Sequence, residues 1–235
     1  MVMKKTGCLE KRINNCKIME KIMVTKSHYN KIKKKYGQYA SWAIWADEES
    51  KPKSKIGDLS IFNLSENPKL LEQLNPNVIM VGLNISRSVT GDIFRNFHDE
   101  SPKNNDFKIR YTFQNTPFYG AYMTDVIKEH VEASSSKVYS CLKKHPEVEL
   151  KNINRFNEEL KCLNVKDPLI IAFGNTSYEI LNRHYKGKYR LVKIPHYSYR
   201  FRGYDKPGYY RKKVLEILKK VVPVQEVWGS EILFD

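Results

Sequence analysis

Three polar side chains lie in or just after apolar runs of the sequence. Asn84 follows the run at 78–83, Asp125 lies within the run at 119–127, and His196 ends the run at 189–196. An asparagine is no general base at neutral pH, so it can only orient water through its carbonyl oxygen. An ionised aspartate only accepts hydrogen bonds, whereas a histidine can donate one. These side chains form a site only if the fold brings them together.

The apolar runs predict the elements that would do so. Strands are expected at 78–83, 119–127, 168–174 and 189–196, and helices at 154–165, 175–187 and 209–222, with Asn175 or Thr176 as the N-cap of the second helix. Strands alternating with helices predict an α/β fold of three layers, α/β/α, in which helices cover both faces of a mostly parallel four-stranded sheet. The site of such a sheet lies at the carboxyl ends of its strands, where all three side chains fall.

Residues 1–50 differ from the rest of the chain. Residues 1–36 carry eleven Lys and Arg against two Glu, which predicts a basic, partly helical N-terminal extension over 1–50, whether solvated or in contact with DNA. Trp42 and Trp45 have helical spacing and are typical of core residues. The α/β domain is then expected to span 51–235.

The composition narrows the class of partner. The 235 residues have a formal net charge of +15, which favours a polyanion, nucleic acid first and an anionic membrane second. No apolar run approaches the roughly 18 residues of a membrane span, and the polar N-terminus is unlike a secretory signal, so a cytoplasmic protein is expected. The four scattered cysteines have no metal-ligand spacing and are interpreted as free thiols. We expect no metal and no cofactor.

Two short stretches carry a family resemblance. VGLNIS (81–86) and PHYSYRF (195–201) look like the two motifs of the uracil-DNA glycosylase superfamily, G-x-[ND]-P after the first strand and H-P-S or N-P-S after the last. The resemblance covers 77–222. Ile85 stands in place of the usual proline, and Tyr197 interrupts the second motif.

The resemblance implies a role for each residue. Asn84 would orient the attacking water, and His196 would donate a hydrogen bond to the pyrimidine O2 as negative charge develops there. Asp125 would read the Watson–Crick edge of a flipped base; as a carboxylate it matches the exocyclic amine of a cytosine rather than O4 of uracil. Ser86 replaces a bulky aromatic and leaves room for a 5-substituent. Leu83 and Ile85 would complete the base site.

The segment 196–213 holds five tyrosines and six basic residues against one acid, a composition that suits phosphates and unpaired bases. Arg200, or else Phe201, would fill the space left by the flipped nucleotide. The expected DNA contacts are Arg87, Ser198, Tyr199, Arg200, Phe201 and Arg202. A solvated basic loop is the alternative for this segment.

Simpler structural roles stay open for the other residues. Asn84 could cap a turn, Asp125 could cap the element after its strand, and His196 could be satisfied in a strand-end turn.

The expected function is a monofunctional DNA glycosylase, acting as a monomer on duplex DNA with a flipped nucleotide or on single-stranded DNA, and not on membranes. It would hydrolyse the N-glycosidic bond of a 5-substituted cytosine and leave an abasic site, as a defence against phage with modified DNA. The alternatives are a repair glycosylase for uracil or mismatched thymine, and a non-catalytic DNA-binding protein with the same fold.

Overall fold

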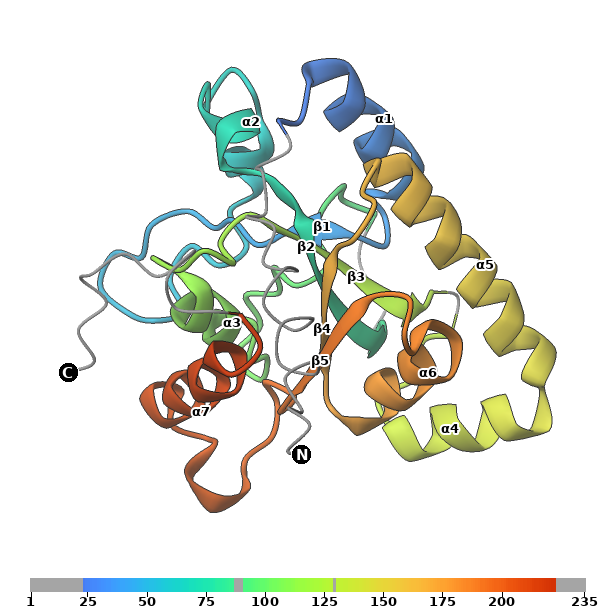
Figure 1. Cartoon of the computed structure of the whole chain (residues 1–235). Coiled ribbons are helices and arrows are strands. Elements are labelled where there is room, and N and C mark those ends of the chain that lie inside the picture. Colours follow the sequence, from blue (N-terminus) through green and yellow to red (C-terminus); the bar gives the residue numbers. More distant parts are fainter. Residues whose placement is uncertain (1–22, 87–90, 129, 223–235) are drawn as a thin grey trace, which may run out of the picture.

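The computed structural model describes residues 23–86, 91–128 and 130–222, which form an α/β fold around a five-stranded mixed sheet. The strand order is β1-β3-β2-β4-β5 (Figure 1). The strands are β1 (Ser41–Trp42), β2 (Asn75–Asn84), β3 (Ala121–Ile127), β4 (Leu169–Phe173) and β5 (Arg190–Ile194).

The four strands expected from the sequence are present and run parallel, because β2 pairs in parallel with both β3 and β4, and β4 with β5. The sheet is nevertheless not four-stranded. The short β1 adds an antiparallel fifth strand to the outer side of β3. Trp42 therefore lies in a strand and not in a helix, although it and Trp45 are core residues as expected.

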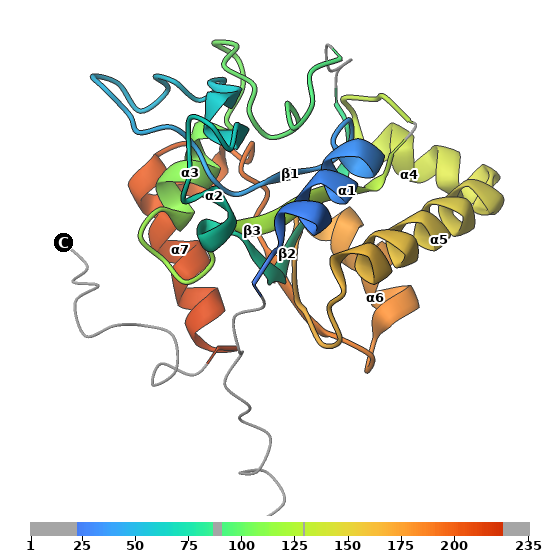
Figure 2. The ribbon, with the colours of Figure 1, turned by 90° about the horizontal axis from the view of Figure 1, so that it is seen from above.

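Helices pack on both faces of the sheet. Successive residues of a strand point to opposite faces, so Ile79 and Val81 of β2 belong to one core cluster and Val78 and Met80 to another. In Figures 1 and 2, α3 and α7 lie on one side of the sheet, and α1, α5 and α6 on the other. The helices are α1 (Lys26–Tyr36), α2 (Leu70–Gln73), α3 (Phe107–Phe113), α4 (Ser135–Lys144), α5 (Pro146–Leu163), α6 (Asn175–Tyr185) and α7 (Pro207–Lys219), with 3₁₀ turns η2 (Leu59–Phe62) and η3 (Phe201–Gly203).

The domain boundary expected at residue 50 falls inside the packed unit. Tyr29 and Ile32 of α1 are buried in the same core cluster as α5 and α6, and Trp42 packs edge-on against Tyr122 of β3 with ring centroids 5.1 Å apart. Residues 23–50 are therefore part of the α/β domain, because their apolar side chains cover the sheet. Residues 1–22 lie outside the described residues.

Two helix starts differ from expectation. The N-cap of α6 is Gly174, with φ of +85° and no side-chain hydrogen bond, rather than Asn175 or Thr176. The helix expected at 154–165 begins earlier, at Pro146, since proline suits the first turn of a helix, where its missing N–H has no partner to lose. In the described part of the chain, no helix has both the length and the apolar character that crossing a bilayer requires.

Candidate active site

Asn84 ends β2, and its amide joins this strand to the segment after β3. Its half-buried Nδ2 donates to the backbone oxygens of His130 and Glu132, each at 2.8 Å, and to that of Ile85 at 3.1 Å. No described residue donates to Oδ1. These contacts fix the orientation of the amide and occupy its nitrogen, so a water or ligand held by this side chain would be held through the carbonyl oxygen. Asn84 therefore does more than cap a local turn.

Asp125 lies beside Gly82 in the pairing of β3 with β2, and its side chain is 3% exposed. Its Oδ2 accepts a hydrogen bond from Asn96 Nδ2 at 2.8 Å. A Cβ added to Gly82 would lie 2.2 Å from Oδ1, so only glycine admits the carboxyl here. Asp125 does not cap the next element, because α4 begins at Ser135 with Ser134 as its N-cap.

Burial decides the ionisation of Asp125. Loss of solvent raises the pKa of this carboxyl to about 6, while the Asn96 hydrogen bond and the nearby Lys128 act in the opposite direction and the charge of Glu159 adds to the increase. The carboxyl is therefore ionised in part near pH 6, where an ordinary aspartate is fully charged.

A buried polar network holds the end of β3 on α5. Lys128 Nζ lies 3.2 Å from Glu159 Oε2, with both side chains 2% exposed or less, and donates to the backbone oxygen of Asp125 at 2.6 Å. Thr124 Oγ1 donates to Glu159 Oε2 at 3.2 Å. Sequence reasoning missed this network. The only signal was a charged residue at 159 on the apolar face of α5.

His196 follows β5 and is held in one tautomer. Ser198 donates to its Nδ1 from the backbone N–H at 3.1 Å, and Ser198 Oγ lies 2.7 Å from the same atom. Since a backbone N–H can only donate, the neutral ring carries its proton on Nε2. Burial, with a smaller contribution from Lys108, lowers the pKa of His196 to about 4. At neutral pH the ring is therefore an uncharged Nε2–H donor, and Ser198 orients this ring.

Tyr197 packs into the site. Its ring stacks on His196 with centroids 4.3 Å apart and meets Phe173 edge-on at 5.3 Å. Phe173 is in turn 6.4 Å from Phe97. Burial, together with the carboxyls of Asp106 and Asp125, raises the pKa of the Tyr197 phenol. The residue that interrupts the second motif thus forms part of an aromatic wall beside Asp125.

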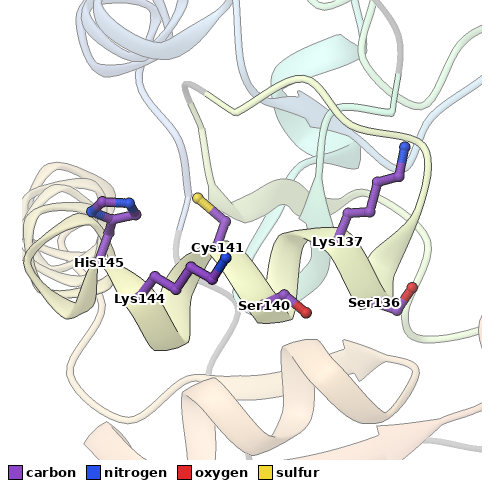
Figure 3. A pocket seen from close by; sticks show the side chains of 6 residues that line it. All are labelled: Ser136, Lys137, Ser140, Cys141, Lys144 and His145. Carbon is purple, nitrogen blue, oxygen red and sulfur yellow. The ribbon is translucent and has the colours of Figure 1, made fainter.

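Two cavities open near these elements. One of about 520 Å³ lies beyond the ends of β4 and β5 and is lined by Leu83, Ser135, Phe173, Gly174, Asn175, Thr176, Ser177, Lys193, Ile194, Pro195, His196, Tyr199 and Ile217. It brings together the expected residues Leu83, His196 and Tyr199, whereas Asn84 and Asp125 are not in its lining. Figure 3 shows the other, an open cavity of about 390 Å³ along α4, lined by Ser136, Lys137, Ser140, Cys141, Lys144 and His145. It contains none of the expected site residues.

The remaining base-site residues surround the end of β2. Leu83 and Ile85 are each 8% exposed, while Ser86 is exposed. Strand β4 separates β2 from β5. Asn84 and His196 therefore reach the same edge of the sheet from strands two spacings apart, roughly 10 Å.

The segment 197–206, here called the aromatic loop, links β5 to α7. Phe201 at its η3 turn is 72% exposed and packs against Tyr199 with centroids 5.8 Å apart. Buried Lys108 anchors the loop by donating to the backbone oxygen of Tyr204 at 3.0 Å. Arg200 and Arg202 are exposed beside Phe201. Arg87, the other expected DNA contact, lies outside the described residues.

Comparison with protein-family models, with curated proteins and with solved structures finds no match to this chain. Within the described ranges, no group of three or more His, Cys, Asp or Glu side chains is arranged to hold a metal ion. Cys141 and Cys162 are free thiols; Cys8 and Cys16 lie outside those ranges.

Proposed function

We propose that this chain is a monofunctional DNA glycosylase with a uracil-DNA glycosylase-like fold, which excises a 5-substituted cytosine and leaves an abasic site. One observation carries the proposal. Asn84 and Asp125, each with a side-chain oxygen to which no described residue donates, and His196, a neutral Nε2–H donor, all lie toward the carboxyl ends of parallel strands. The proposed reaction needs one group to orient a water, one to bind the edge of the base and one to stabilise the leaving group, and these three side chains have the chemistry for those roles.

In the proposed reaction, the nucleotide is flipped out of the duplex and Asp125 binds the base edge. Asn84 Oδ1 orients a water toward C1′, and its direction is fixed by the backbone oxygens that hold Nδ2. His196 stabilises the charge that develops on O2, and a donor of this kind is worth about 3 kcal/mol. The exposed Ser86 leaves space for the 5-substituent. Defence against phage with modified DNA is the role this substrate suggests.

A non-catalytic DNA-binding protein is the second candidate. It is favoured by the hydrogen bonds that the Asn84 amide nitrogen gives to backbone oxygens, which are a structural role, and by the packing of Tyr197 beside Asp125. A repair glycosylase for uracil or mismatched thymine remains the alternative among enzymes, although the buried carboxyl of Asp125 fits their bases less well.

The decisive experiment measures abasic sites. Duplexes containing uracil, a G·T mismatch, 5-hydroxymethylcytosine or its glucosylated form are incubated with the protein and then cleaved with alkali. We expect cleavage at the modified cytosines alone, reduced roughly 100-fold or more in His196→Gln. His184→Gln, which changes a histidine of α6 outside the proposed machinery, should behave as wild type. No cleavage of any substrate, with salt-sensitive DNA binding retained, would establish the non-catalytic candidate.

The aromatic loop offers a separate test of base flipping. Phe201→Ala should lower excision from duplex DNA roughly tenfold, because no side chain then fills the space that the flipped nucleotide leaves in the base stack. Excision from single-stranded DNA should be unchanged. The matched control is Val221→Ala. Val221 is 40% exposed and lies beyond α7, about 20 Å along the helix from the aromatic loop. An equal loss on both DNA forms would contradict a wedge role for Phe201.

A further inference from the structure

The two carboxyl oxygens of Asp125 have different surroundings. Asn96 donates one amide hydrogen to Oδ2 and the other to the backbone oxygen of Tyr39, each at 2.8 Å. Asn96 is thereby fixed as a donor. Oδ1 lies against Gly82, and no described residue donates to it. When the carboxyl is neutral, its proton belongs on Oδ1, because Oδ2 already faces an N–H.

Cytosine bases pose a specific chemical problem to a glycosylase. Any pyrimidine departs with the electron pair of the broken bond, and cytosine spreads the resulting negative charge less well than uracil because it has one ring carbonyl where uracil has two. Its N3 carries no hydrogen and can accept a proton. Protonation at N3 allows it to leave as a neutral molecule. A positioned acid whose pKa lies near the operating pH is the usual solution.

We propose that Asp125, held through Oδ2 by Asn96, is the general acid that gives the proton on Oδ1 to N3 of the departing cytosine. This inference rests on the proposed glycosylase function. Asn96 is a positioning residue, since it acts on the base only through Asp125. One group then both binds the cytosine edge and activates the base, because the neutral carboxyl donates to N3 while Oδ2 still accepts from the exocyclic amine.

The step balances in atoms and charge. The bond from C1′ to N1 breaks, and its electron pair passes into the ring as the Asp125 O–H bond breaks and the N3–H bond forms. The oxygen of water bonds to C1′ and its proton passes to solvent, from which Asp125 regains a proton. The products are the free cytosine and an abasic sugar with a hydroxyl at C1′.

The charges around Asp125 suit an acid that operates near neutral pH. Burial keeps its pKa at about 6 although Lys128, from the end of β3, favours the ionised form. Glu159 of α5 opposes Lys128, and the Tyr197 phenol after β5 is neutral. Asn96 stabilises the carboxylate that remains after proton transfer.

The test is the pH dependence of single-turnover excision of 5-hydroxymethylcytosine between pH 5 and 9. Wild type should show a constant rate below about pH 6 and a tenfold fall per pH unit above it. Asp125→Asn, of the same shape but without the proton, should be slower by roughly 10²- to 10⁴-fold at pH 6 and show no bend. Asn96→Ala should move the bend to higher pH, because the hydrogen bond that favours the carboxylate is lost.

The outcomes separate this inference from the proposed function. Excision that rises with pH through 6 and then stays constant would mean that the ionised carboxylate is the active form, and would overturn the acid role while the glycosylase stands. A bend that Asn96→Ala leaves in place would overturn the role of Asn96. Absence of excision from every modified cytosine would contradict the proposed glycosylase function, and the acid role with it.

Discussion

At the scale of single residues, the site depends on the contact between a glycine and a carboxyl on neighbouring strands. Gly82 is the glycine of the first motif, VGLNIS (81–86). The packing explains why this position is a glycine, because the Asp125 carboxyl occupies the volume that any larger side chain would need.

Gly82→Ala should therefore lower the free energy of unfolding by about 1–3 kcal/mol, since buried Asp125 has to move off Asn96, and under the proposed glycosylase function it should also abolish excision. Urea denaturation and the abasic-site assay measure the two effects. The matched control is Gly91→Ala, where an added Cβ meets nothing within 4 Å. A Gly82→Ala variant as stable and active as Gly91→Ala would show that Asp125 is not held as described.

The ionisation of Asp125 predicts how stability depends on pH. Its pKa is higher in the folded protein than in the unfolded chain, so folding is favoured by the protonated form, and wild type loses stability as pH rises from about 4 to about 6. Asp125→Asn removes this loss. It should stabilise the protein by about 2–3 kcal/mol at pH 8 and by little at pH 4. Thermal denaturation at the two pH values tests this, and equal effects at both would contradict it.

Some of this detail was beyond sequence reasoning. The positions of Asn84, Asp125 and His196 at or near the ends of strands could be predicted, because each lies in or next to a continuous apolar run. The contacts of Asn84 with residues 130 and 132, and of Asn96 with Asp125, join segments far apart in the chain with no periodic signal. The tautomer of His196 depends on a single hydrogen bond from Ser198.

At the scale of elements, the site requires β3 to be held on α5 by the buried pair Lys128–Glu159. Such a pair stabilises little compared with an apolar replacement, yet leaving one partner alone is costly. Lys128→Met should lower the free energy of unfolding by roughly 3–5 kcal/mol, because Glu159 then has no counter-charge.

The double variant Lys128→Met/Glu159→Gln should recover most of this loss, and urea denaturation of the single and double variants measures the recovery. A double variant that is less stable than Lys128→Met would contradict the pairing. The exposed pair Lys213–Glu216, at 3.0 Å on α7, is the control, since its removal should change stability by less than about 1 kcal/mol.

The parallel strands were predictable and the added elements were not. Buried parallel strands are apolar throughout, which is a strong signal in the sequence. Strand β1 has only two residues, too few to show a period, so the edge of the sheet was missed. Pro146 starts α5 before the apolar pattern begins, since its first turn is polar.

At the scale of the whole molecule, the described core begins at Val24. A chain of residues 51–235 lacks α1 and β1, exposes the outer side of β3, and should fail to unfold cooperatively. A chain of residues 23–235 keeps every contact of the described structure and should retain a cooperative transition, followed by circular dichroism. Cooperative unfolding of 51–235 near the wild-type melting temperature would restore the domain boundary at residue 50.

The aromatic loop has a consequence for how free molecules behave toward one another. Phe201 and Tyr199 form an exposed apolar patch, a feature that promotes self-association. The net charge of +15 keeps copies apart at low ionic strength, and salt screens this repulsion over shorter distances as its concentration rises. If the protein binds DNA as proposed, the salt that releases it from DNA also screens the repulsion between its copies, so we expect aggregation to be fastest in the salt that elutes the protein from DNA.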